Sequence, residues 1–236
     1  MSEADLPGTR LAAVASFIEP GARICDVGSD HAKLPVWLFQ KGLIRSAVLT
    51  DINKAPLLRA KASIERADFL SCSEFVLCDG LAGVDPSSFD TLIISGMGGE
   101  TIRGILAAAP WLREGYSLVL QPNSGEYELR EYLYGNGYEI KGGKIANEGH
   151  FFYCVMSVCG GYMELRHKAH LHAGEEYVRS RDPLFCDYAD YLIRGFELAA
   201  GGLSAAKGDN SERIAEISEI IAEIGRMKGE VQNANP

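Results

Sequence analysis

The segment best suited to chemistry is ICDVGSDHA, residues 24–32. Its apolar first half predicts a β-strand, and its polar second half predicts a tight turn before a helix. A turn that cradles a dinucleotide follows the pattern G-x-G-x-x-G, whereas this one has only Gly28, and Asp30 would repel a phosphate. Acidic residues beside a single glycine, with Asp26 in the strand, suit a ligand that carries positive charge and no phosphate.

S-adenosylmethionine has these properties, because it carries an ammonium and a sulfonium group. Its close approach to the backbone requires a small residue, which Gly28 supplies. Ser29 and His31 lie in the same turn, where His31 is equally explained as a turn residue and as a functional one. The alternative for the whole segment is a polar turn capped by an aspartate.

Two further acidic residues follow the next two predicted strands. Asp51, with Ile52 after it, lies roughly 20 positions after Gly28, where a carboxylate can accept hydrogen bonds from ribose hydroxyls. Asp79, followed by Gly80, is placed to accept a bond from an adenine amino group. Each aspartate alone is also explained as a turn cap. Three acidic strand ends in succession favour a nucleoside-containing ligand.

The fourth and fifth predicted strands also end in unusual motifs. SGMGG has three glycines within four residues, which leaves the backbone N–H groups around Gly96 and Met97 unobstructed. Close packing at the start of a helix explains the same glycines. LQPN presents the side-chain amides of Gln121 and Asn123 beside a rigid proline, and such amides can grip the donor and acceptor edge of a base.

These motifs depend on alternating strand and helix patterns for their positions. The strands are expected at 23–27, 46–51, 74–78, 91–95, 117–120, 138–145 and 151–159, and the helices at 34–41, 55–67, 100–108 and 126–136. The last two strands are too close for a helix between them, so they are expected to form an antiparallel hairpin. The pattern predicts an α/β fold with a doubly wound sheet, in which ligands bind outside the carboxyl ends of the strands.

The C-terminal part has a different pattern. Helices are expected at 184–203 and from Ser211 onward, joined by a short turn as an antiparallel hairpin. Four isoleucines of the second helix recur at the spacing of a coiled-coil seam: Ile214, Ile217, Ile221 and Ile224. Nearby glycines predict a frayed tail over 231–236. We therefore expect two domains, 1–160 and 161–236.

The composition is that of a globular protein: 47% of the 236 residues are hydrophobic and 23% are charged, which excludes a disordered or fibrous chain. No apolar run is long enough to span a membrane, and residues 1–10 are too polar for a signal peptide, so we expect a cytoplasmic protein. The six cysteines match no zinc or disulfide pattern. His167, His170 and His172 are expected to be solvated, and no metal is predicted.

The motifs GSDHAxLP, SGMGG and LQPN together resemble the bacterial tRNA (adenine-N1)-methyltransferase family called TrmK, which modifies adenine 22 in the tRNA D-loop. They occur in the family's order between about residues 10 and 160. The resemblance implies a class I, Rossmann-like methyltransferase domain, S-adenosylmethionine as methyl donor, and a C-terminal coiled coil that helps to hold tRNA. We expect a monomer.

Such a reaction is a direct displacement, in which the enzyme aligns adenine N1 with the sulfonium methyl group. The target base must leave its stack, and the ring becomes cationic as it gains the methyl group, so a carboxylate or amide oxygen would stabilise it. The residues expected to orient the base as catalytic groups are Asp30, Gln121 and Asn123. The expected cofactor site comprises Arg10, Asp26, Gly28, Ser29, Asp30, His31, Asp51, Ile52, Asp79, Gly80, Gly96 and Met97.

Two alternatives remain open at this point: methylation of another RNA or a small metabolite, and a non-catalytic S-adenosylmethionine-binding scaffold. The net charge of −9 argues against a broad phosphate-binding surface. If the substrate is tRNA, binding is expected to be salt-sensitive and to use a local basic cluster. The candidates for this cluster are Arg10, Lys33, Arg103, Arg166, Lys168, Arg179 and Arg181.

Overall fold

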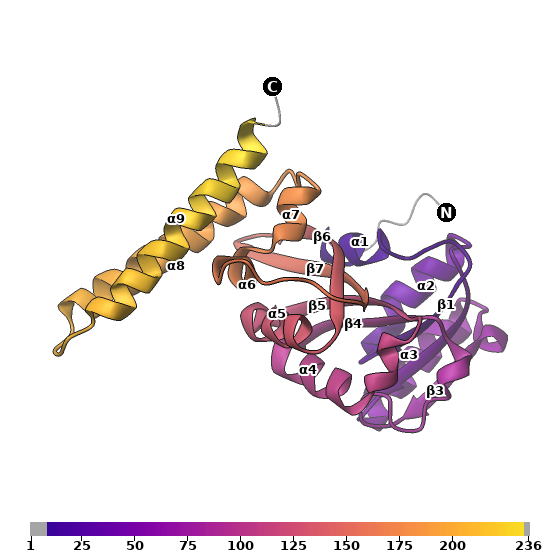
Figure 1. The fold of residues 1–236 in the computed structure, drawn as a ribbon. Helices are drawn as coiled ribbons and strands as arrows, with labels where there is room; N and C mark the ends of the chain where they lie inside the picture. The colour runs from indigo at the N-terminus through magenta and orange to yellow at the C-terminus, as the bar shows by residue number, and fades with distance from the viewer. Residues whose placement is uncertain (1–8, 234–236) are drawn as a thin grey trace.

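The computed structural model describes residues 9–233, so the expectations for the first eight residues and for 234–236 lie outside the described residues. Within 9–233 the chain forms a seven-stranded sheet flanked by helices, with two long helices as an arm (Figure 1). The strands are β1 (Ala22–Val27), β2 (Ile44–Asp51), β3 (Ser73–Leu77), β4 (Thr91–Gly98), β5 (Ser117–Ser124), β6 (Tyr138–Glu148) and β7 (Phe151–Gly160). The helices are α1 (Thr9–Ala15), α2 (Lys33–Gln40), α3 (Lys54–Arg66), α4 (Gly99–Ala108), α5 (Glu126–Gly135), α6 (Ala169–Ala173), α7 (Glu175–Arg179), α8 (Phe185–Ala205) and α9 (Ser211–Asn233).

The strand order is β3-β2-β1-β4-β5-β7-β6. The pairs among β1 to β5 are parallel, and β7 lies antiparallel between β5 and β6. This order confirms the doubly wound sheet and the terminal hairpin. The chain reverses its direction of winding between β1 and β4, and ligands of such sheets bind at that switch point.

The sheet is buried on both faces, as the continuous apolar runs predict. Leu92, Ile93 and Ile94 are consecutive in β4 and have no exposed surface. Leu92 and Ile94 pack in a hydrophobic cluster with residues of α4 and α5, while Ile93 packs in another with residues of α1, α2 and α3. The sheet therefore holds the carboxyl ends of the parallel strands β1 to β5 rigidly along one edge.

The secondary structure of the SGMGG and LQPN motifs differs from the prediction. We expected turns, but β4 and β5 continue through them, and Met97 pairs with Pro122. The register shifts around Gly96, whose φ is +86°. A bulge of this kind bends a strand and redirects its side chains, which explains why a glycine-rich segment remains in the sheet.

The C-terminal helices α8 and α9 form the predicted antiparallel hairpin, which extends from the sheet as an arm (Figure 1). Burial along α9 increases toward its base: Ile214 and Ile217 are partly exposed, whereas Ile224 is buried. The frayed tail was a wrong expectation for its described part, because α9 continues to Asn233 and Val231 is buried. Packing at the base of the arm outweighs the low helix propensity of the nearby glycines.

The arm is packed against the sheet through two short helices. Short helices α6 and α7, which the sequence pattern did not indicate, pack with the base of α8 and α9 against Ile145 and Cys154 of the β6–β7 hairpin. Arg130 of α5 is fully buried at this junction, and its Nη2 lies 2.8 Å from Oε1 of Glu176 in α7. The two expected domains thus share a core.

Candidate functional site

The turn after β1 has a backbone that few residues adopt. Gly28 has a φ of +77°, and its N–H donates to the carbonyl of Thr50 in β2 at 2.8 Å. His31 and Ala32 also have positive φ, at +64° and +47°. A non-glycine residue in such a conformation costs about 1–3 kcal/mol and typically occurs at a functional site. The strain therefore supports a ligand-binding role for this turn.

Asp26 lies at the end of β1, below this turn. It is 8% exposed, and burial raises the pKa of its carboxyl group to about 7. A buried carboxylate without a cation is unfavourable. A positively charged ligand would stabilise the ionised form.

A cavity of about 370 Å³ lies at the switch point between β1 and β4. Its lining residues are Arg10, Leu11, Asp26, Gly28, Ser29, Asp30, His31, Ala32, Lys33, Leu34, Ser95, Gly96 and Asn123. The volume suits part of a small ligand. The cavity brings together the predicted residues near β1 with Ser95 and Gly96 of the SGMGG motif and Asn123 of the LQPN motif.

The remaining predicted cofactor residues lie outside this cavity. Asp51 ends β2, and its Oδ1 accepts a bond from the N–H of Asn53 at 2.8 Å; Ile52 beside it is 62% exposed. Asp79 and Gly80 line a separate cavity of about 460 Å³ against α4. The acidic strand ends therefore do not converge on one cavity.

Met97 lies directly against the turn, because a Cβ at Gly28 would lie 2.3 Å from its Cε. The nearby glycines have two different causes. A Cβ at Gly96 would make ordinary van der Waals contact with Arg10 Nη1 at 3.5 Å, whereas a Cβ at Gly99 would lie 2.2 Å from the carbonyl oxygen of Gly125. Steric packing thus explains why residue 99 is a glycine, and the φ of +86° explains why residue 96 is one.

A network of side chains crosses the floor of the 370 Å³ cavity. Arg10 Nη1 donates to Gln121 Oε1 at 2.6 Å and to Ser95 Oγ at 2.8 Å. Gln121 Nε2 donates to Asn123 Oδ1 at 3.2 Å, and Asn123 Nδ2 donates to the Gly96 carbonyl at 2.9 Å. The network fixes Arg10 and Asn123 in the cavity wall.

Gln121 cannot play its predicted part in this geometry. It is fully buried, and both of its polar atoms have partners within the protein. The expectation that this amide contacts a base directly is therefore wrong. Gln121 instead positions Arg10 and Asn123 by hydrogen bonds. The sequence did not indicate the role of Ser95 as an acceptor for Arg10, although Ser95 is the first residue of the SGMGG motif.

Asp30 is exposed at the rim of the cavity. Its Oδ1 lies 2.8 Å from Arg59 Nη2 of α3, and its Oδ2 lies 3.7 Å from His31 Nε2. Arg59 was also missed, because a single arginine on an amphipathic helix gives no signal of its own. Its guanidinium holds the Asp30 carboxylate in place at the rim.

The three histidines after β7 serve the junction with the arm. The expectation that they are solvated is wrong for His170, which is 3% exposed and lies between two carboxylates, Glu175 Oε1 at 3.2 Å and Glu223 Oε1 at 3.1 Å. His172 packs on aromatic rings, and burial lowers its pKa to about 4. In the part of the chain that the structure describes, no group of three or more His, Cys, Asp or Glu side chains could hold a metal ion.

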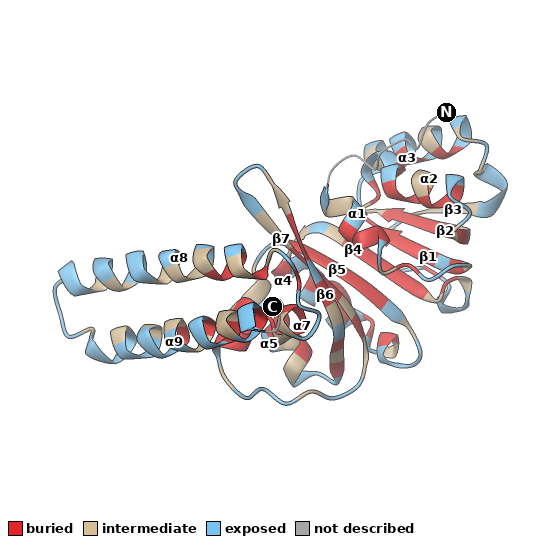
Figure 2. Cartoon of the chain, turned by 90° about the horizontal axis from the view of Figure 1, so that it is seen from above, coloured by how far each residue is buried: buried red, intermediate tan, exposed pale blue. Residues whose placement is uncertain are grey.

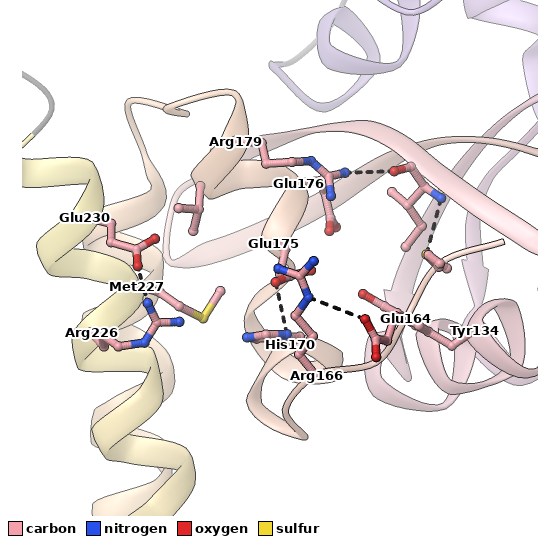
Figure 3. A pocket seen from close by; sticks show the side chains of 13 residues that line it. Tyr134, Glu164, Arg166, His170, Glu175, Glu176, Arg179, Arg226, Met227 and Glu230 are labelled. Carbon is pink, nitrogen blue, oxygen red and sulfur yellow. Dashed lines mark hydrogen bonds and ion pairs between the residues drawn. The ribbon is translucent and has the colours of Figure 1, made fainter.

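A cavity of about 340 Å³ adjoins His170 between α6, α7 and α9 (Figure 3). Side chains of both signs surround it, including Arg166, Arg179 and Glu175. Arg179 Nη2 donates to the carbonyl of Ile140 at 2.8 Å. Four glutamates and three arginines line this cavity together with His170, so charges of opposite sign compensate one another within it.

The expected basic cluster is divided among several places. Arg10 and Lys33 line the cavity at β1 and β4, whereas Arg166 and Arg179 line the one beside His170. Two other members form ion pairs with local carboxylates: Arg103 with Glu100 and Lys168 with Glu216. These residues do not form one phosphate-binding patch.

Comparison with known proteins agrees with this architecture. Residues 8–156 match a family model described as a methyltransferase domain. The chain is 36% identical over 132 residues to the tRNA (adenine(22)-N(1))-methyltransferase of Bacillus subtilis (strain 168). That alignment covers 56% of this chain and 56% of the relative, so it spans just over half of the relative's length.

Solved structures resemble the chain over a greater length. The crystal structure of the B. subtilis m1A22 tRNA methyltransferase TrmK has a TM-score of 0.80 at 26% identity, covering 96% of this chain and 100% of that chain. A Streptococcus pneumoniae protein in complex with S-adenosyl-L-methionine has a TM-score of 0.80 at 29% identity, covering 93% and 98%. Among the described residues, no helix is long and apolar enough to cross a membrane.

The matching domain model, the similar structures and the cavity at the switch point of the sheet lead to one assignment. The chain belongs to the methyltransferase-domain family, among the TrmK proteins.

Proposed function

We propose that this protein transfers a methyl group from S-adenosylmethionine to N1 of adenine 22 in the D-loop of tRNA. The observation that carries this proposal is the cavity at the switch point, which combines a buried carboxylate at Asp26, a turn with a positive-φ glycine at Gly28 and a fixed amide at Asn123. The name of the B. subtilis relative supports the tRNA position. The cofactor-bound S. pneumoniae structure supports the donor.

The residues of the cavity fit S-adenosylmethionine, which supplies an electrophilic methyl group when bound. Asp26 is buried without a cation of its own, so it suits the cofactor's positive charge. Arg10 suits the carboxylate of the methionine part, because its guanidinium is already fixed by Gln121 and Ser95. Asp51 remains our candidate for the ribose hydroxyls.

The adenine part of the cofactor would meet Asp79 and Gly80, which line the separate cavity against α4. Ile52 is exposed beside Asp51 and offers an apolar contact there. Ser29, His31, Gly96 and Met97 complete the proposed cofactor site as backbone and van der Waals contacts.

The acceptor base would be oriented by Asn123 at the rim of the cavity. Its amide oxygen accepts one bond from Gln121 and has a second lone pair, which can stabilise the positive charge that develops on the methylated ring. Asp30 adds a carboxylate on the same rim, held by Arg59. Adenine N1 attacks with its own lone pair, so no covalent enzyme nucleophile is required.

The division of labour along the chain is also part of the proposal. Residues 1–160 would bind the cofactor and perform the transfer, and residues 161–236 would assist in holding tRNA. Because tRNA is the proposed substrate, the cytoplasm is the proposed place of action, and a monomer suffices because one chain contains the whole cavity.

The test is incubation with labelled S-adenosylmethionine and bulk bacterial tRNA, followed by nucleoside analysis. We expect label in N1-methyladenosine, lost when adenine 22 is replaced in a transcript. Label in another nucleoside or in a small metabolite would redirect the proposal to that acceptor. Cofactor binding without any transfer would indicate a scaffold. Unchanged cofactor binding by Asp26→Ala in calorimetry would contradict the proposed cofactor site.

A further inference from the structure

The tip of the β6–β7 hairpin projects beyond the neighbouring strands (Figure 2). Glu148 pairs with Phe151 across a two-residue turn, in which Gly149 has a φ of +67°. Positive φ at a central position is typical of tight hairpin turns. The tip is therefore a well-defined turn, and the Phe151 side chain on it is 66% exposed.

Helix α1 contacts both the tip and the cavity at β1 and β4. Thr9 Oγ1 donates to the carbonyl of Asn147 at 2.8 Å, and the N–H of Arg10 donates to Glu148 Oε1 at 2.9 Å. The side chain of the same Arg10 lines the cavity at β1 and β4. One residue thus contacts both the tip and the proposed site of methyl transfer.

The two faces of β7 have different partners near the tip. The ring of Phe152 lies 5.6 Å from that of Tyr188 and 5.5 Å from that of Tyr191, both in α8. Successive side chains of a strand point to opposite faces, so Phe151 and Tyr153 face away from α8.

Tyr153 shows where that opposite face leads. Its ring centroid lies 5.8 Å from Arg10 Cζ, so it lies beside the guanidinium that enters the cavity. Phe151 is two residues along the same face, a distance of about 7 Å in a strand. Phe151 therefore presents an exposed ring about two residues beyond Tyr153 on the side of Arg10, in a hairpin whose other strand is held by α1.

We propose that Phe151 is a stacking platform for an unpaired base of the RNA substrate, adjacent to the base that enters the cavity. This inference rests on the proposed function, which places an RNA loop at the mouth of that cavity. Every base has a π face, so an aromatic ring binds it with little sequence preference. A single exposed ring provides little area for a protein partner, whereas it matches the area of one base.

The experiment compares Phe151→Ala with Phe151→Trp and with Leu70→Ala, a control at a 39% exposed position just before the amino end of β3. We expect the alanine variant to raise the KM for tRNA about tenfold, with the KM for S-adenosylmethionine unchanged. The tryptophan variant should keep the wild-type KM, and its fluorescence should be quenched by a D-arm oligonucleotide with an unpaired loop.

Several outcomes would overturn the inference. These are a KM for tRNA within twofold of wild type in Phe151→Ala, equal effects of Phe151→Ala and Leu70→Ala, or no quenching in Phe151→Trp. Failure of the wild-type protein to methylate any tRNA would instead contradict the proposed function. In that case, direct RNA-binding measurements on the same variants still decide whether Phe151 contacts RNA.

Discussion

Arg130→Met should unfold the protein far more readily than the loss of an ordinary surface ion pair. The Arg130 side chain is fully buried in α5, and its Nε and Nη2 both donate to Glu176 Oε1, at 3.2 Å and 2.8 Å. It also donates to the Tyr177 hydroxyl at 3.0 Å and to the Leu171 carbonyl at 3.3 Å. Burial opposes the charged guanidinium, but Glu176 raises the pKa of Arg130 above its usual range.

The magnitude follows from what methionine would leave behind. The Glu176 carboxylate is 2% exposed and would lose its cation, and breaking such a buried pair costs about 3–5 kcal/mol. A chain of this size changes its melting temperature by about 2–4 °C per kcal/mol. The expected fall is therefore about 6–20 °C.

Urea and thermal unfolding, followed by circular dichroism, measure this effect. Arg23→Met is the matched control, because the Arg23–Asp90 pair is exposed and such pairs contribute about 0–1 kcal/mol. The double variant Arg130→Met/Glu176→Met removes both buried charges and should recover at least half of the loss. A single variant that loses less than about 1 kcal/mol, or a double variant less stable than the single one, would refute the reasoning.

Three further predictions concern the site. Burial raises the pKa of Asp26 to about 7, and a cationic ligand favours its ionised form. The affinity for S-adenosylmethionine, measured by calorimetry, should therefore rise with pH from about 6 to 8 and then level off. A flat profile in wild type, or the same rise in Asp26→Asn, would contradict this. Gln121→Leu removes a hydrogen-bond acceptor of Arg10, so the KM for S-adenosylmethionine should rise about tenfold. The control Ser16→Ala should leave this KM unchanged. Equal KM values for the two variants would show that Gln121 does not position Arg10. Gly99→Ala should lower the free energy of unfolding by at least about 2 kcal/mol, because the added methyl group would contact the Gly125 carbonyl. Gly104→Ala, in open space on α4, should be neutral or stabilising in the same thermal unfolding experiment.

The strand pattern could be predicted because it depends on local apolar runs, such as residues 91–94 of β4. The position of the first turn followed from Gly28 and the doubly wound topology. The continuation of β4 and β5 through their motifs could not, because pairing between Met97 and Pro122 outweighs the local signal of glycine and proline.

Burial of polar side chains was the main feature that the sequence did not reveal. Gln121 follows an apolar strand and resembles an exposed strand end, but its partner Arg10 comes from a helix 111 positions earlier. Arg130 lies at an ordinary position of an amphipathic helix, and its partner Glu176 is 46 positions later. Only the tertiary fold brings such pairs together, so no local pattern could have identified them.

The net charge of −9 limits how this protein can bind RNA. Long-range affinity for nucleic acids depends on cations that neutralise phosphates, yet Arg103 and Lys168 are paired with glutamates. On the proposed function, affinity for tRNA would therefore come to a larger extent from contacts to bases, through the proposed roles of Asn123 and Phe151. On this reasoning, Phe151→Ala should weaken binding by a similar factor at low and at high salt, because base stacking releases few counterions. A Phe151→Ala effect that disappears at high salt would show that phosphate contacts dominate instead.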